Sequence, residues 1–152
     1  PRLRILRQFS ESLGGRMAPR SLMLSASTAD AEVMAVLAAY VAEHYASPLR
    51  MVDLDRHCHV SVRTLQNLCH AHCGEAPLKV LRRFRLQKLH SQIHGRPWSS
   101  LRQHYLDCGL TGSQADRDLF VAMYGCTVRE HQDASRYKRS REPVVADFMR
   151  SA

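Results

Sequence analysis

Hydrophobic residues recur at three- and four-residue spacing along most of the chain, as expected for amphipathic helices. The clearest segment begins at Asp30, carries Leu37 and Val41 on its apolar side, and ends at Ser47-Pro48. Asp30 is a suitable N-cap and Pro48 a suitable stop. Nowhere do apolar and polar residues alternate as in a half-buried strand. The pattern therefore predicts an all-α fold.

About seven helices and a short N-terminal one account for this pattern. In chain order the expected helices cover residues 2–13, 30–47, 49–58, 61–73, 77–94, 98–108, 112–124 and 127–137. Short turns precede Ser61 and Gly112, so the order of brief helix, turn and second helix occurs twice. The spacing predicts two helix-turn-helix units joined by the long helix over 77–94.

Domain boundaries follow from the breaks between these segments. A connector that includes the short amphipathic helix covers residues 1–29, and a first helix-turn-helix unit covers 30–76. A linker helix over 77–94 leads to a second unit over 95–137, and a basic C-terminal tail covers 138–152. No apolar run approaches the ~20 residues that cross a membrane. We therefore expect a soluble protein with no membrane partner.

The charge of the chain indicates a class of partner. Its 152 residues include 22 Lys and Arg against 14 Asp and Glu, which gives a net charge of +8. Residues 50–94 carry a net +5, whereas residues 95–136 are neutral. A basic excess favours a polyanionic partner such as nucleic acid. We expect that attraction to come mainly from the first unit and the linker helix.

The helix expected over 61–73 has two distinct faces. Its apolar face carries Leu65, Leu68 and Cys69, whereas its polar face carries Arg63, Gln66, Asn67 and His70. Arg, Gln and Asn can form bidentate hydrogen bonds with guanine or adenine edges in the major groove of DNA. The helix follows a turn and lies in the basic segment, so we interpret this face as base-contacting rather than as a merely solvated surface.

Further candidate contacts divide between bases and phosphates. On the second recognition helix, over 112–124, the candidates for base contact are Ser113, Gln114 and Arg117. The candidates for phosphate contact are basic side chains of the linker helix and hydroxyl groups, namely Arg82, Arg83, Lys88, Ser61, Thr64 and Thr111. Arg85 lies on the same helix and could contact a phosphate, or it could instead have a structural role by pairing with Asp53 or Asp55. Asp118 would be repelled by phosphates, so we expect the second helix to contribute less.

Two groups of residues resemble the sequence signatures of a known protein family. The segment Val60-Ser61-Val62-Arg63-Thr64-Leu65-Gln66, followed by Gly74, Pro77 and residues 81–86, resembles the first DNA-binding half of the AraC/XylS family of bacterial transcription regulators. That family's second-half signature has a Gly-aromatic pair, a Phe, an aromatic-Gly pair and a Ser or Thr. The corresponding residues here are Cys108-Gly109-Leu110, Phe120, Tyr124-Gly125 and Thr127. The resemblance covers residues 32–137.

The resemblance implies the C-terminal DNA-binding domain of such a regulator, with its two helix-turn-helix units in successive major-groove turns of promoter DNA. It also implies activation of transcription, RNA polymerase as a second partner and a cytoplasmic location at the nucleoid. A ligand-binding or dimerisation domain would precede Pro1. No cofactor is implied.

Several residues depart from the family pattern, most of them in the second half. Tyr105 stands where a small Ala is usual, Asp116 where the family favours an apolar residue, and Asp118 where a basic residue usually faces DNA. In the first half, Asp55 takes a small-residue position, and His59 takes a turn position often given to Gly.

Other functions compete with DNA binding. The helix-turn-helix scaffold would serve as a protein-interaction module if its neutral second unit contacted RNA polymerase or a partner domain. His57-Cys58-His59 and the segment 69–73 contain zinc-ligand types, but Cys69 and Cys73 take apolar positions and the sequence has no Cys-x-x-Cys pair, so we expect no metal. The sequence also lacks a Gly-rich phosphate loop, a His-Glu-x-x-His motif and a nucleophile elbow, so we expect no enzymatic activity.

Overall fold

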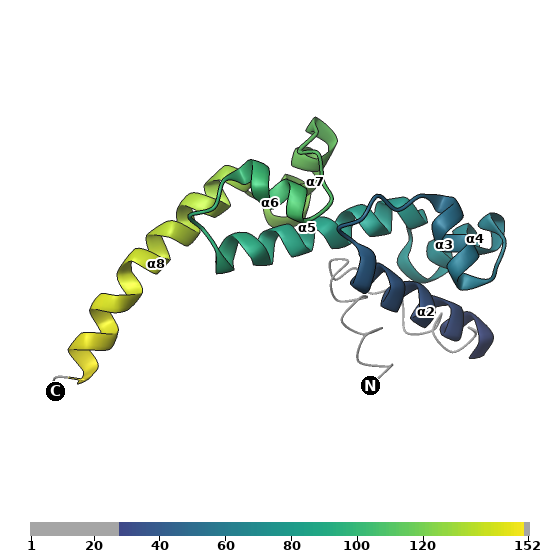
Figure 1. The fold of residues 1–152 in the computed structure, drawn as a ribbon, viewed down its shortest axis with the longest axis horizontal. Coiled ribbons are helices and arrows are strands. Elements are labelled where there is room, and N and C mark those ends of the chain that lie inside the picture. The colour runs from purple at the N-terminus through teal and green to yellow at the C-terminus, as the bar shows by residue number, and fades with distance from the viewer. Residues whose placement is uncertain (1–27, 151–152) are drawn as a thin grey trace. The chain divides into compact units, whose positions relative to one another are not determined.

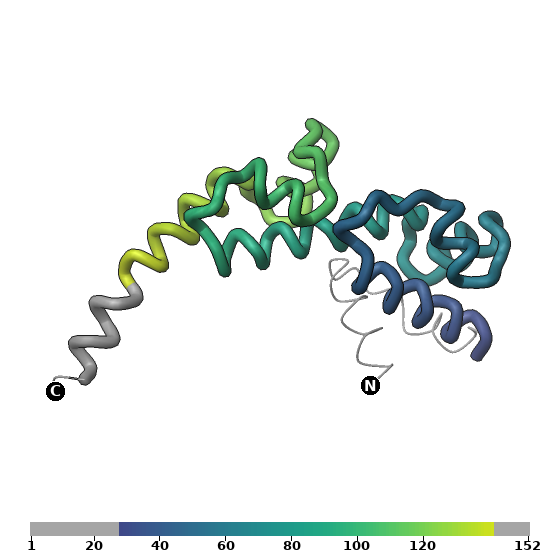
Figure 2. Tube along the Cα trace, viewed as in Figure 1, coloured from purple at the N-terminus to yellow at the C-terminus, as the bar shows by residue number. Residues whose placement is uncertain are grey.

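A computed structural model describes the backbone of residues 28–150 and the side chains of residues 28–141 (Figures 1 and 2). The described part contains seven helices and no strand, which confirms the predicted all-α fold. The helices are α2 (Thr28–His44), α3 (Met51–Cys58), α4 (Val62–Cys73), α5 (Pro77–Gly95), α6 (Leu101–Asp107), α7 (Gln114–Tyr124) and α8 (Val128–Arg150). The helix expected over 2–13 and most of the connector lie outside the described residues.

The chain divides into two compact units, and the boundary falls inside α5, between Arg85 and Leu86. The first unit therefore contains α2, α3, α4 and the start of α5. The second unit contains the rest of α5 with α6, α7 and α8. Within the described residues, no helix has both the length and the apolar character needed to span a membrane.

The first unit is held together by an apolar core. Leu37 and Val41 of α2, Leu54 of α3, and Leu65 and Cys69 of α4 are all at most 2% exposed. Full burial of a Leu or Val side chain contributes about 1.5–3 kcal/mol. The start of α5 adds Val80, Leu81 and Phe84 to the same core. Three helices and the start of a fourth thus pack around one apolar core.

Arg85 fixes the end of α2 to the start of α5. Its Nε donates to the carbonyl of Tyr45 at 2.7 Å, and one terminal nitrogen donates to the carbonyl of Ser47 at 2.6 Å. These carbonyls follow the last turn of α2, where backbone acceptors have no partner within the helix. They take the place of Asp53 and Asp55, the acidic partners that the sequence suggested.

The second unit has a core that mixes apolar and polar side chains. Leu89, Ile93 and Phe120 are fully buried, but so is His104, and Gln132 is 4% exposed. The buried polar groups are hydrogen-bonded to the backbone: His104 Nε2 lies 3.1 Å from the Arg96 carbonyl, and Gln132 Nε2 donates to the carbonyls of Pro97 and Ser99. Such bonds offset the cost of removing polar groups from water.

Several helix boundaries differ from the prediction. The last helix continues to Arg150 instead of ending at residue 137. α6 begins at Leu101 instead of Trp98, because the Ser100 side chain caps it by accepting from the Gln103 amide. α2 begins at Thr28, which places Asp30 in its first turn rather than at its N-cap.

A stack of rings closes the second unit between α5, α7 and α8. The His90 ring stacks on Tyr124 at a centroid distance of 4.2 Å and on His131 at 3.9 Å. His131 Nε2 also lies 3.1 Å from the His90 carbonyl. Burial is the main cause that lowers the pKa of His90 to about 4, and the neighbouring His131 and His94 lower it further. The stack therefore contains a neutral His90.

Because the folded pKa of His90 lies below its unfolded value of 6.5, the unfolded chain takes up the proton first as the pH falls. Stability should be fully present above pH ~6.5 and fall by on the order of 2 kcal/mol as the pH approaches about 4. Urea unfolding followed by circular dichroism at a series of pH values measures this loss. His90→Phe keeps a stacking ring without the titration, so its pH dependence should be clearly flatter; an unchanged slope would contradict the assignment.

Candidate nucleic-acid interface

The α3–α4 pair has the local geometry of a helix-turn-helix. α3 ends at His59, whose φ of +54° is left-handed, a conformation that Gly adopts more easily. Ser61 caps α4 by accepting from the Thr64 amide at 3.1 Å, and Gly74, with φ of +71°, ends the helix. The short turn and the two well-defined ends fix where α4 begins and which way it faces.

The structure places Arg63, Gln66, Asn67 and His70 on the outer face of α4, where all four are exposed. Leu65, Leu68 and Cys69 hold the opposite face in the core, as predicted. Within the described part of the chain, none of the four outer side chains has a hydrogen bond or an ion pair with another residue. Their donors and acceptors therefore face solvent on a helix that is fixed from behind.

Two of the residues predicted to contact phosphates form the N-terminal cap of α4. The Ser61 and Thr64 hydroxyl oxygens lie 2.8 Å apart and share a hydrogen bond, while Ser61 also accepts from the Thr64 amide. Both residues are exposed. Either hydroxyl can still accept another bond, but the main role of the pair in this structure is to begin the helix.

The three basic candidates on α5 differ in their surroundings. Arg83 Nε lies 2.8 Å from one carboxylate oxygen of Glu75, and Lys79 lies 3.2 Å from the other. Its side chain is 22% exposed, so Arg83 belongs to a local ion-pair group. Arg82 in the first unit and Lys88 in the second are exposed. Their greater exposure makes these two more accessible to a phosphate than Arg83.

The second recognition helix, α7, begins with a capping box. The Ser113 hydroxyl accepts from the Asp116 amide at 3.3 Å, and the Asp116 carboxylate accepts from the Ser113 amide at 3.0 Å. The Thr111 hydroxyl lies 3.4 Å from the same carboxylate. Asp116 is only 2% exposed. This departure from the family pattern is therefore a helix cap, and Ser113 and Thr111 are part of it.

The remaining candidates on α7 are bonded to their own unit. Gln114 Nε2 donates to the Asp118 carboxylate at 2.7 Å, and Arg117 Nε donates to the Gly112 carbonyl at 3.0 Å. These bonds hold both side chains against their own unit. In this respect α7 differs from α4, whose outer side chains have no such partners among the described residues.

Tyr105, the second departure, is accommodated by a glycine. An ideal Cβ added to Gly112, whose φ is +69°, would lie 3.1 Å from the ring of Tyr105. The bare backbone of Gly112 thus leaves the space that the ring fills. This pairing cannot be predicted from the sequence, because Tyr105 lies in α6 and Gly112 in the turn that precedes α7.

The cysteines are not arranged as a reactive or metal-binding centre in the described residues. Burial raises the pKa of Cys69 to about 12 and those of Cys58 and Cys73 to about 11, which keeps the three thiols protonated at neutral pH. No cluster of three or more His, Cys, Asp or Glu side chains suited to a metal ion occurs in residues 28–141. Cys69 packs in the core, as its place on the apolar face predicted.

A shallow, open hollow of about 520 Å³ lies between α2 and α3. It is lined by Val36, Tyr40, Asp53, Arg56, His57 and His59. The rings of Tyr40 and His57 stack at 3.9 Å across it, which ties the two helices together. The lining contains no nucleophile with an orienting base and acid, so the hollow does not suggest a catalytic site.

Searches against protein-family models and against solved structures gave no match to this chain.

The Tyr105–Gly112 contact can be measured directly. Gly112→Ala should lower the free energy of unfolding by about 2 kcal/mol, of which about 1 kcal/mol is the strain of a side chain at positive φ and the rest is the contact with Tyr105. In a Tyr105→Ala background the same substitution should cost only about 1 kcal/mol. Urea unfolding of the four proteins gives the coupling.

Gly74→Ala is the matched control for the strain alone, because Gly74 has nearly the same φ and an added Cβ would meet no atom within 4 Å. This substitution should lower the free energy of unfolding by about 1 kcal/mol. Equal penalties for Gly112→Ala with and without Tyr105 would show that the ring does not depend on this glycine.

Proposed function

We propose that the chain is a sequence-specific, double-stranded DNA-binding domain of a bacterial transcription regulator of the AraC/XylS type, and that α4 reads bases in the major groove. The observation that carries the proposal is the outer face of α4. It presents Arg63, Gln66, Asn67 and His70, exposed and without partners among the described residues, on a helix held firmly by its apolar face. Side chains of these types recognise guanine and adenine edges.

The dimensions of α4 support this proposal. The helix has 12 residues, which corresponds to a length of about 18 Å. The major groove is about 12 Å wide and admits one α-helix. In helix-turn-helix proteins the N-terminal residues of the second helix contact base edges, and Arg63 lies one residue after the start of α4. Arg63 is therefore the leading candidate for a guanine contact.

Phosphate attraction would come from the segment that carries the net +5, residues 50–94. Within it Arg82 and Lys88 are exposed on α5, whereas the Arg83 side chain is only 22% exposed. Contacts with phosphates position a protein on DNA without specifying sequence. We assign the nonspecific part of the affinity to this segment and the specific part to α4.

The second helix, α7, would contribute less to base readout. Gln114 and Arg117 are bonded within their own unit, and Ser113 is used as a cap. The same observation favours a second candidate function, in which this unit contacts a protein such as RNA polymerase while the first unit binds DNA. Promoter DNA as the target, activation of transcription, and a location at the nucleoid belong to the proposal through the family resemblance.

A target duplex can be selected from a random pool with the unaltered chain. On that duplex, Arg63→Ala should weaken binding by about 1–3 kcal/mol and relax the preference at one or two base pairs, because a bidentate base contact is lost. Arg117→Ala should cost about 0.5 kcal/mol or less, because this side chain bonds to Gly112. Fluorescence anisotropy on the selected and on a random duplex provides both affinities.

Arg82→Ala provides the contrast, since a phosphate contact affects both duplexes alike and its loss should reduce the salt slope by about one. Arg63→Ala is expected to leave the random duplex almost unaffected. Equal losses on the two duplexes would reassign Arg63 to the DNA backbone. Failure to select any sequence would refute specific DNA binding itself.

A further inference from the structure

The loop between α5 and α6 is fastened to α8 by side chains that are far away in sequence. Gln132 donates to the carbonyls of Pro97 and Ser99 at 2.9 and 2.7 Å, and Arg136 Nε donates to the Pro97 carbonyl at 2.9 Å. Arg139 donates to the Gly95 carbonyl at 3.1 Å. His104 on α6 adds a bond to the Arg96 carbonyl. A loop with this many backbone bonds is held in one conformation.

This fixed loop displays the single tryptophan of the chain. Trp98 is 67% exposed, although the neighbouring Pro97 is fully buried. The Arg136 guanidinium carbon lies 5.6 Å from the centre of the Trp98 ring, which is within the range of a cation–π interaction. The ring is thus in contact with Arg136 while most of its surface stays open to solvent.

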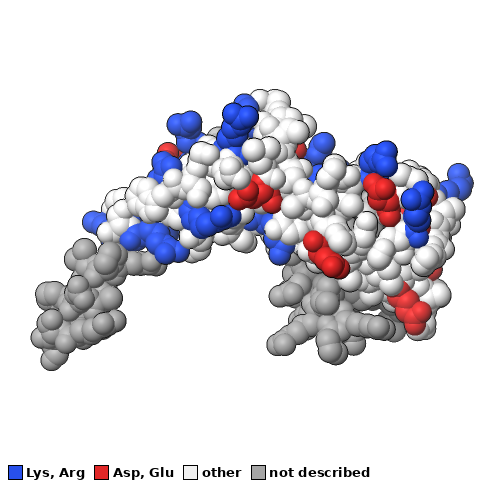
Figure 3. Space-filling model, viewed as in Figure 1, with Lys and Arg blue, Asp and Glu red and all other residues white. Residues whose placement is uncertain are grey.

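One arginine contacts Trp98, and two more arginines belong to the same loop or bond to it. Arg96, Arg136 and Arg139 belong to the loop or reach it from α8, and the Arg96 side chain is 56% exposed. Their acidic neighbours are Asp107, 3.1 Å from Arg96, and the exposed Asp133, 3.4 Å from Arg136. Figure 3 shows Lys and Arg side chains gathered along the described part of α8. We call Trp98, Arg96, Arg136 and Arg139 the Trp98 surface.

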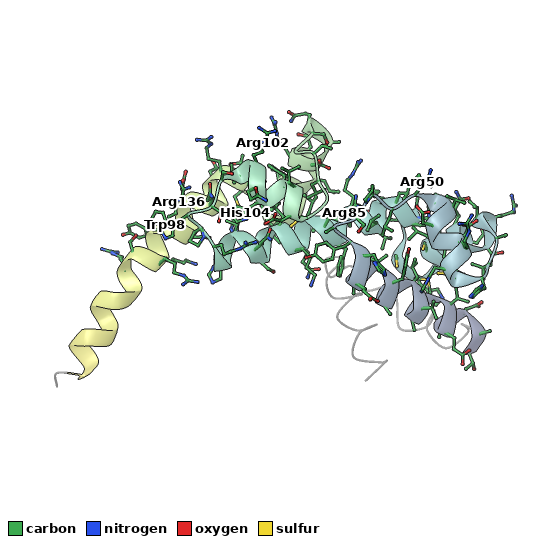
Figure 4. The ribbon with its side chains drawn as sticks, viewed as in Figure 1. Arg50, Arg85, Trp98, Arg102, His104 and Arg136 are labelled. Atoms are coloured by element: carbon green, nitrogen blue, oxygen red, sulfur yellow. The ribbon has the colours of Figure 1, made fainter. Side chains whose placement is uncertain are left out.

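The Trp98 surface is separate from the candidate DNA-reading helix of the same unit. In Figure 4, Trp98 and Arg136 are labelled together where α8 passes the loop, whereas α7 lies on the other side of α6 (compare Figure 1). A Trp ring stacks on bases mainly where they are unpaired or splayed apart.

We propose that the Trp98 surface is a docking site for an acidic segment of a partner protein, in which an apolar side chain covers the Trp98 ring and carboxylates pair with Arg136 and Arg139. Trp and Arg are the residue types that most often dominate protein interfaces. The positive charge selects an acidic partner, and the fixed loop removes the entropic cost of ordering the site. The site is independent of base reading by α4.

The test uses the full chain and a short fluorescein-labelled peptide of Asp, Glu and Leu. A matched peptide with Asn and Gln in place of the acids is the control for charge. The acidic peptide should bind, shift the emission of Trp98 to shorter wavelength, and lose affinity as salt is added. Trp98→Ala and Arg139→Gln should each weaken binding about tenfold by anisotropy.

Arg102→Gln is the matched variant, because Arg102 is an exposed arginine of the same unit that Figure 4 places apart from Trp98. It should leave the peptide affinity unchanged. Thermal unfolding by circular dichroism verifies that each variant folds. No binding, equal binding of the two peptides, or no effect of Trp98→Ala would overturn the proposal.

Nucleic acid is tested in parallel, with a random duplex and a single-stranded oligonucleotide. If these shift the Trp98 emission and the acidic peptide does not, the Trp98 surface belongs to a nucleic-acid interface and the proposal is wrong. Failure here is distinguishable from failure of the proposed function. Arg63→Ala should affect duplex binding alone, whereas Trp98→Ala should affect peptide binding alone.

Discussion

The burial of the apolar face of α4 is the interaction on which the proposed function depends. A helix of 12 residues is marginally stable in water, so α4 persists because Leu65 and Cys69 pack against α2 and α3. That packing also fixes the orientation of the opposite face. Four polar side chains are thereby presented to solvent at little further cost in entropy, which is what a base-reading helix requires.

The two units achieve stability by different means, and the difference explains their surfaces. The first unit relies on an apolar core, which leaves the outer side chains of α4 without partners among the described residues. The second unit buries His104, Asp116 and Gln132, and each of them has a hydrogen bond to the backbone. Its surface side chains are also hydrogen-bonded within the unit. Gln114 and Arg117 bond to neighbouring residues of the unit, and three α8 side chains bond to the loop that carries Trp98.

Periodicity was sufficient to predict the helices of the described part and the two faces of α4, because an apolar stripe of period 3.6 is a local signal. The capping role of Asp116 is also predictable from the sequence, since Ser and Asp three residues apart at the start of a helix form a recognised motif, although Asp116 departs from the family pattern. The hydrogen bonds between α8 and the α5–α6 loop cannot be predicted from the sequence. Its bonds join residues 33 to 44 positions apart in sequence, and no local pattern marks such pairs.

Methylation protection on a duplex selected from a random pool measures directly whether α4 contacts bases. Dimethyl sulfate reacts with guanine N7 in the major groove, the atom that a base-reading arginine contacts. If α4 reads bases, guanines within one major-groove segment should be strongly protected, and Arg63→Ala should lose that protection at one or two guanines. Protection that is absent, or that persists unchanged in Arg63→Ala, would contradict base reading by α4.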